Sequence, residues 1–185
     1  MAEPLADQII RKVEQAAELY HRLLLVVAPA GAGKTTALRD VRDRTGAPLV
    51  NINLDLSRRM LELTERQRAL QLPRLLREIV GNGGGEMILL DNIEVIFDVG
   101  LKQDPLRLLQ GLSRNKTVVA AWNGKIESDE WKVMSDEPKP SDSSLITPSS
   151  SLYLTYAAPD HPEYRRYPMR DFLVASPFGT TNEHE

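Results

Sequence analysis

The chain has 185 residues, 42% of them hydrophobic and 26% charged, a balance typical of one globular domain. It contains no cysteine, which excludes disulfides, cysteine-ligated zinc and thiolate catalysis. A net charge of −3 disfavours autonomous duplex-DNA binding, because phosphate neutralisation supplies most of that affinity. No secretory signal is evident, and no apolar run approaches the roughly 20 residues of a membrane span. We therefore expect a cytoplasmic protein without membrane contact.

Helical and strand patterns alternate along the chain. In order, they predict a helix over 4–22, a strand over 23–27, a helix over 33–44, a strand over 49–54, a helical stretch over 57–80, a strand over 87–91, a helix from Pro105, a strand over 117–122 and a last strand over 152–156. The helical stretch is predicted to break near Pro73, because proline lacks the N–H that an interior position needs. Asp104 is the expected N-cap of the helix that Pro105 begins.

This alternation predicts an α/β fold, a three-layer αβα sandwich with a mostly parallel sheet of about five strands. Residues 1–124 are expected to form the core together with the N-terminal helix. Residues 125–151 are rich in Ser, Pro, Asp and Glu, which predicts a mobile loop. Residues 152–185 then return as the last strand and the C-terminal segment of the same domain.

A phosphate-binding loop is predicted between the first apolar strand and the next helix. Residues 28–36 read Ala-Pro-Ala-Gly-Ala-Gly-Lys-Thr-Thr. Small residues let the backbone curl round a phosphate, and the following helix directs its N-terminal dipole at the same anion. The alternative is an ordinary glycine-rich turn. The residues expected to bind the nucleotide are Pro29, Ala30, Gly31, Ala32, Gly33, Lys34, Thr35 and Thr36.

The magnesium side of this site is predicted at Thr35 and Asp91. The Thr35 hydroxyl follows Lys34, whose ammonium is expected on the β- and γ-phosphates of ATP. Asp91 ends an apolar strand, where an unpaired carboxylate needs solvent or a cation. The alternative for Asp91 is a residue that only opens a turn. Hydrolysis also needs a base: Glu94 is narrowly favoured over a reading in which Asn92 occupies the base position and turnover is slow.

Two further residues are candidate catalytic groups. Asn123 ends the predicted strand over 117–122 and could contact the γ-phosphate, or it could form an Asn-Gly turn with Gly124. Arg114 could stabilise transition-state charge in a neighbouring subunit, or it could complement the dipole of its own helix. A cluster with the composition of a single-strand nucleic-acid contact, or of a packed surface segment, occupies residues 164–167.

The chain resembles the BrxF family, the small P-loop proteins of type 3 BREX (bacteriophage exclusion) defence systems. The resemblance rests on residues 28–35, on Leu-Asp-Asn-Ile-Glu at 90–94, and on the longer runs 102–115, 117–124 and 156–164. It implies an accessory ATPase, with ATP and Mg²⁺ as ligands, in an antiphage assembly. It also implies partner proteins of that system, with DNA contact through them. The strand-inserted layout of AAA+ cores without a helical lid is expected, and self-assembly is an open expectation.

Three functions are compatible with these residues. An ATPase is favoured. A nucleotide-dependent switch with little hydrolysis is the alternative, and Asn92 is the residue in its favour. A small-molecule kinase is disfavoured, because the acidic 127–151 stretch does not look like an arginine-rich lid.

Overall fold

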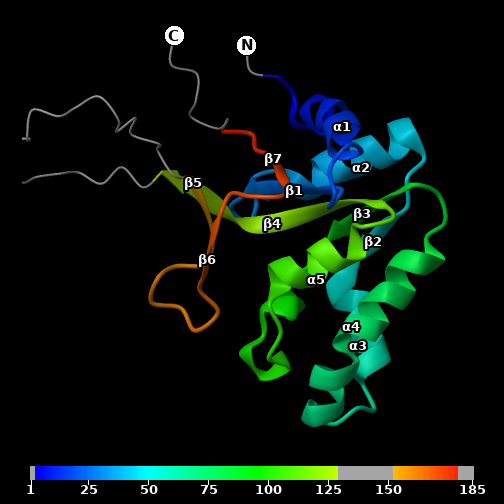
Figure 1. Ribbon diagram of the computed structural model, residues 1–185, viewed down its shortest axis with the longest axis vertical. Coiled ribbons are helices and arrows are strands. Elements are labelled where there is room, and N and C mark those ends of the chain that lie inside the picture. Colours follow the sequence, from blue (N-terminus) through cyan, green and yellow to red (C-terminus); the bar gives the residue numbers. More distant parts are fainter. Residues whose placement is uncertain (1–2, 129–151, 179–185) are drawn as a thin grey trace, which may run out of the picture.

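The computed structural model describes residues 3–128 and 152–178. They form an α/β fold in which helices cover both faces of a mostly parallel sheet (Figure 1). The helices are α1 (Leu5–Ala16), α2 (Lys34–Thr45), α3 (Ile52–Met60), α4 (Glu65–Asn82) and α5 (Pro105–Leu112), with the short 3-10 helices η1 (Glu94–Phe97) and η2 (Val99–Leu101). The strands are β1 (Leu23–Ala28), β2 (Leu49–Asn51), β3 (Met87–Asp91), β4 (Thr117–Ser128), β5 (Leu152–Tyr156), β6 (Arg165–Pro168) and β7 (Leu173–Ala175). None of the helices in the described ranges is long and apolar enough to cross a membrane.

Five strands make up the parallel part of the sheet. Their order is β2-β3-β4-β1-β7, and every neighbouring pair is parallel. β4 therefore lies between β1 and β3. Because the five strands point the same way, their carboxyl ends meet at one edge of the sheet, which is where α/β proteins commonly bind ligands. The prediction of a mostly parallel sheet with helices on both faces is confirmed.

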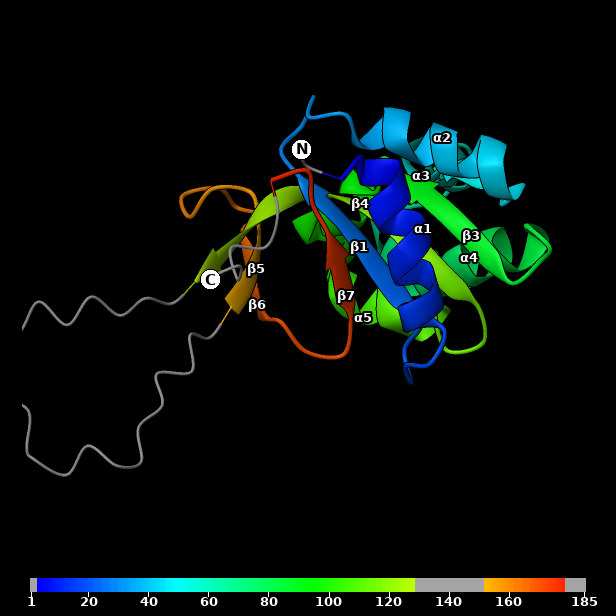
Figure 2. The same ribbon diagram turned by 90° about the horizontal axis from the view of Figure 1, so that it is seen from above.

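Each face of the sheet has its own apolar core. Leu24 and Val26 of β1 pack with α1 and α2 on one face. Figure 2 shows these two helices beside the sheet from above. Leu23, Leu25 and Val27 pack with α3, α4 and α5 on the other face. A strand covered on both sides carries an uninterrupted apolar run, and β1 is such a strand.

The second strand and the first helix are shorter than predicted. β2 ends at Asn51 instead of residue 54. The Asn51 side chain accepts a hydrogen bond from the Leu54 N–H at 3.0 Å and so caps α3, which starts at Ile52. α1 ends at Ala16, whereas the periodicity predicted a helix to residue 22.

The predicted helix break at Pro73 is wrong. The chain instead breaks at residues 61–64, and Thr64 and Gln67 form a reciprocal capping box that begins α4. Pro73 lies inside α4, where it cannot donate to the carbonyl of Ala69. The Gln103 side chain donates to that carbonyl at 3.0 Å in place of the missing backbone N–H. A residue far along the chain thus permits a proline within the helix.

β4 is longer than predicted and belongs to two sheets. Its first half pairs with β1 and β3, and from Gly124 onward it pairs antiparallel with β5. The Asn-Gly turn considered for Asn123 and Gly124 is therefore wrong, since both residues lie within the strand. A Cβ atom at Gly124 would lie 1.8 Å from the Thr155 carbonyl oxygen, so the crossing of β4 and β5 requires glycine here.

The predicted loop begins later than expected, because residues 125–128 continue β4. The remainder of that loop, residues 129–151, lies outside the described residues. The strand predicted over 152–156 is present as β5, although it pairs with β4 and β6 away from the parallel strands. β5 and β6 project to one side of the parallel sheet (Figure 1). The short strands β6 and β7 were not predicted; β7 extends the parallel sheet beyond β1.

Candidate functional site

The loop between β1 and α2 lies at the carboxyl edge of the sheet. Gly31 and Gly33 have φ angles of +80° and +91°, a left-handed conformation that side chains disfavour. Gly33 immediately precedes the first residue of α2. These two glycines let the chain turn from the end of β1 into the helix, whose N-terminus carries partial positive charge.

Lys34 is the first residue of α2 and is buried, with 7% of its surface exposed. Its ammonium donates hydrogen bonds to the carbonyl oxygens of Ala28 and Pro29, both at 2.8 Å. Burial lowers the pKa of Lys34, while the charges of Glu94 and Asp91 act in the opposite direction. A buried ammonium beside two carboxylates provides a cation at the mouth of the loop, as anion binding requires.

Thr35 and Asp91 are in direct contact. The Thr35 hydroxyl donates to Asp91 Oδ2 at 2.7 Å, and the Asn92 N–H donates to Asp91 Oδ1 at 2.9 Å. Asp91 is 6% exposed. The structure therefore places side by side the two residues that the sequence predicts as metal ligands, and both present oxygen atoms, the donors that Mg²⁺ prefers.

Glu94 is held by two amides from different elements. Asn123 Nδ2 donates to Glu94 Oε1 at 2.6 Å, and Asn53 Nδ2 donates to Glu94 Oε2 at 3.3 Å. Asn53 Oδ1 also accepts the Val95 N–H at 2.9 Å, which fixes the orientation of the Asn53 amide. The Glu94 carboxylate thus lies beside Asn123, the last residue of β4 that pairs with β1.

These groups line one cavity of about 310 Å³. It is lined by Ala30, Gly31, Gly33, Lys34, Thr35, Thr36, Asp91, Asn92, Glu94 and Asn123. Of the residues predicted to bind the nucleotide, Pro29 and Ala32 are not in that lining, although the Pro29 carbonyl accepts the Ala32 N–H at 3.3 Å within the loop. Lys34, the two residues of the metal side, Glu94 and Asn123 all come together here.

No protein-family model matches the chain, and no curated protein matches it. The interpretation of the cavity therefore rests on the residues that line it.

Asn92 has two roles in the backbone of this site. Its φ of +51° is in the left-handed region, which asparagine tolerates better than most residues. Its carbonyl oxygen accepts the Asn53 N–H at 2.9 Å. This turn brings Glu94 to the cavity two residues later, so both Asn92 and Glu94 line it.

Arg114 lies at the opposite edge of the sheet, just before β4 begins. It is exposed, its Nη2 donates to the Tyr20 hydroxyl at 2.6 Å, and its guanidinium lies 5.2 Å from the Tyr20 ring centroid. Arg114 therefore does not contribute to the cavity of its own chain. A catalytic role for this residue requires a second copy.

The tyrosine and arginine cluster at 164–167 is partly packed: Tyr164, Arg165 and Tyr167 are half-buried, and Arg166 is exposed. The Tyr167 hydroxyl donates to Asp104 at 3.0 Å, and its ring packs edge-on to Trp122. The Arg166 guanidinium lies 3.7 Å from the ring centroid of Tyr153. The contacts of Tyr167 fit the packed-segment alternative.

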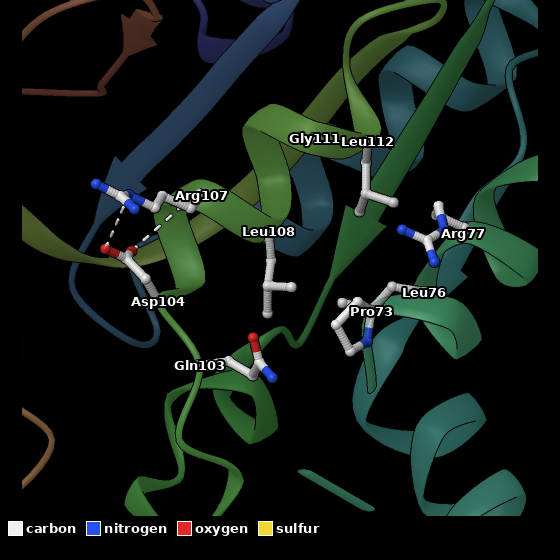
Figure 3. A pocket seen from close by; sticks show the side chains of 9 residues that line it. All are labelled: Pro73, Leu76, Arg77, Gln103, Asp104, Arg107, Leu108, Gly111 and Leu112. Carbon is white, nitrogen blue, oxygen red and sulfur yellow. Dashed lines mark hydrogen bonds and ion pairs between the residues drawn. The ribbon is translucent and has the colours of Figure 1, made fainter. Parts of the chain in front are cut away.

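A second cavity, of about 400 Å³, lies between α4 and α5 (Figure 3). Arg77 lines one side of it, and Arg107 lines the other and pairs with Asp104 at 4.0 Å. Its remaining lining is mostly apolar or uncharged and includes Pro73 and Gln103. Its lining includes no glycine-rich loop and no lysine, so it does not resemble the loop cavity chemically.

Asn53 is the site residue that sequence reasoning missed. It was placed in a strand, whereas it lies in the first turn of α3, and its contact with Glu94 joins residues 41 positions apart. The only local signal was Asn51, whose capping character marks the start of that helix.

Proposed function

We propose that this chain is a Mg²⁺-dependent ATP-binding protein of the P-loop NTPase class and an ATPase. The observation that carries the proposal is the convergence of Lys34, Thr35, Asp91 and Glu94 on one cavity at the carboxyl edge of the sheet. The sheet order, with β4 between β1 and β3, supports the strand-inserted type of P-loop fold.

The side chains divide the work of phosphate transfer to water. Lys34 and the loop N–H groups would bind the β- and γ-phosphates of ATP, and Thr35 with Asp91 would hold Mg²⁺. When bound, Mg²⁺ offsets negative charge on the phosphate oxygens. Glu94 orients the attacking water and accepts its proton, and Asn123 fixes the Glu94 carboxylate from β4.

The test is steady-state hydrolysis of Mg-ATP by the purified protein, with Lys34→Ala and with Lys125→Ala as a matched control. Lys125 is exposed and lies outside the cavity lining. We expect turnover that Lys34→Ala abolishes and Lys125→Ala preserves. Turnover that survives Lys34→Ala would contradict the assignment of this loop.

A nucleotide-dependent switch with little hydrolysis is the second candidate. Both oxygens of Glu94 accept hydrogen bonds from asparagine amides, which compete with an attacking water for the same lone pairs. Wild-type protein that binds Mg-ATP and changes its sedimentation without consuming ATP would support the switch. It would also leave the phosphate assignments intact.

We further propose that the protein is a cytoplasmic component of a type 3 BREX antiphage system, on the resemblance carried by residues 90–94 and 102–124. Its partners would be other proteins of that system, and DNA would be contacted through them. Co-purification with the other components expressed together tests this, and Lys34→Ala reports whether assembly needs the nucleotide.

A further inference from the structure

Phe178 is an exposed aromatic residue just beyond β7. Its exposed fraction is 73%, whereas Val174 and Ala175 of the preceding strand are buried. Single exposed apolar side chains are common on protein surfaces. The backbone around this one, however, is held in place.

Two hydrogen bonds fix the chain just before Phe178 to helix α1. The Ser176 N–H donates to Gln8 Oε1 at 2.8 Å, and Gln8 Nε2 donates to the Ser176 carbonyl at 3.2 Å. The Phe178 N–H donates to the Ser176 hydroxyl at 3.3 Å. Lys12 of α1 also donates to the Val174 carbonyl. An aromatic ring is thus presented to solvent from an anchored backbone.

Phe178 lies in the turn that follows β7, at the edge of the sheet that carries the phosphate loop. β7 runs parallel to β1, with Ala175 beside Val26, so both strands end at this edge. Figure 2 shows β1 and β7 side by side and the chain beyond β7 turning at this edge.

The groups expected at the terminal phosphate lie on the other side of β1. Asp91 and Glu94 follow β3, and Asn123 belongs to β4, so all three are on the β3–β4 side. A nucleotide has its terminal phosphate at one end and its base at the other. With the phosphates in the loop after β1, the base is directed toward β7.

We infer that Phe178 stacks on the base of the bound nucleotide, which makes the ligand a nucleoside triphosphate rather than a bare polyphosphate. This inference rests on the proposed function. An aromatic ring offers its face to any base, so stacking adds affinity with little discrimination between bases.

The experiment is isothermal titration calorimetry with two probes, Mg-ATP and Mg-tripolyphosphate. Wild type is compared with Phe178→Ala and with Phe178→Tyr, which retains the ring. Leu70→Ala is the matched control, because Leu70 is 72% exposed, about as much as Phe178, and lies outside the lining of the loop cavity.

We expect Phe178→Ala to weaken Mg-ATP binding about tenfold and to leave tripolyphosphate binding unchanged. Phe178→Tyr should keep the wild-type ATP affinity, and Leu70→Ala should change the affinity for neither probe. Equal ATP affinity in wild type and Phe178→Ala would overturn the inference while leaving the phosphate site standing. Equal loss of both probes would also overturn it, since the ring would then support the loop. A wild type that binds neither probe would overturn the proposed function as well.

Discussion

At the scale of single residues, the proposed hydrolysis depends on Glu94 and on the two amides that hold it. Asn53 comes from α3 and Asn123 from β4, so the carboxylate joins elements on either side of β3. A carboxylate with both oxygens engaged keeps one orientation, which suits a group that must direct a water molecule.

Glu94→Gln tests this role. The amide keeps the shape and can still accept the Asn123 hydrogen bond, but it cannot accept a proton. We expect kcat to fall about 100-fold or more, with the Kd for Mg-ATP little changed. Single-turnover hydrolysis and calorimetric titration measure the two quantities. Glu62→Gln, the same chemical change at an exposed site, is the control. A Glu94→Gln protein with the wild-type rate would remove Glu94 from the mechanism.

Tyr156 provides a prediction in the alkaline range. Burial, with the charges of Glu163 and Glu94, raises the pKa of Tyr156 to about 12. An unfolded tyrosine ionises near pH 10. Between pH 10 and 12 the Tyr156 hydroxyl therefore stays protonated in the folded state but is ionised in the unfolded state, and the free energy of unfolding falls as pH rises. Relative to Tyr156→Phe, wild type should lose up to about 1.4 kcal/mol of unfolding free energy per pH unit in that window. Urea titrations of the two proteins at several pH values measure this. A difference in unfolding free energy that stayed constant from pH 10 to 12 would refute the prediction.

At the scale of elements, the sequence predicted what depends on local pattern. The buried strands β1 and β3, the glycine turn into α2 and the Asp104 cap of α5 all depend on neighbouring residues, and they form as expected. Lys34, Asp91 and Glu94 also line one cavity, as the alternation of strands and helices implies. The capping box at Thr64 is also a local pattern, a threonine followed three residues later by Gln67, and it marks the start of α4.

Other features depend on distant partners and could not be predicted from one segment. Pro73 stays helical only because Gln103 reaches the freed carbonyl. β6 and β7 have four and three residues, and each exists because another strand lies beside it. Asn53 contacts Glu94, 41 positions away, and no sequence spacing predicts that contact.

A double-mutant cycle tests the account of Pro73. Gln103→Ala should cost about 1 kcal/mol in wild type, because the Ala69 carbonyl loses its donor. In a Pro73→Ala background residue 73 regains its N–H, so Gln103→Ala should cost much less. Chemical denaturation measures all four proteins. Equal costs in the two backgrounds would show that Gln103 does not replace the backbone donor.

Gly124 and Gly111 make a matched pair. Alanine at Gly124 would collide with the Thr155 carbonyl, and we expect it to destabilise the protein by about 1–3 kcal/mol or more. Gly111 lies in α5 with nothing within 4 Å of an added Cβ, so Gly111→Ala should stabilise by about 0.5–1 kcal/mol. Thermal unfolding measures the stability of both variants. A Gly124→Ala protein as stable as wild type would mean that β4 and β5 can move apart at this position without cost.

At the scale of the whole molecule, the cavity and Arg114 lie at opposite edges of one sheet. A contact between Arg114 and a nucleotide therefore requires a head-to-tail arrangement of copies, in which the edge of one faces the other edge of the next. Such an arrangement would need the self-assembly that the sequence leaves as an open expectation.

The alternative in which Arg114 serves a neighbouring site makes a mixing prediction. Arg114→Ala and Glu94→Gln proteins should each be inactive alone, one lacking the arginine and the other the base. Mixed, they should regain part of the hydrolysis rate, because some interfaces pair an intact Arg114 with an intact Glu94. Titrating one variant into the other measures this. An Arg114→Ala protein with full activity would confine this arginine to its contact with Tyr20.

The division of β4 between two sheets has a mechanical consequence. Asn123 is the last residue of β4 paired with β1, and Gly124 is the first paired with β5. The amide that holds Glu94 thus lies where β4 passes from the parallel sheet to its antiparallel pairing with β5. A protein that docked on β5 and β6 and shifted them would also shift the Asn123 side chain. The proposed hydrolysis rate would then depend on whether a partner is bound to β5 and β6, because Asn123 positions Glu94.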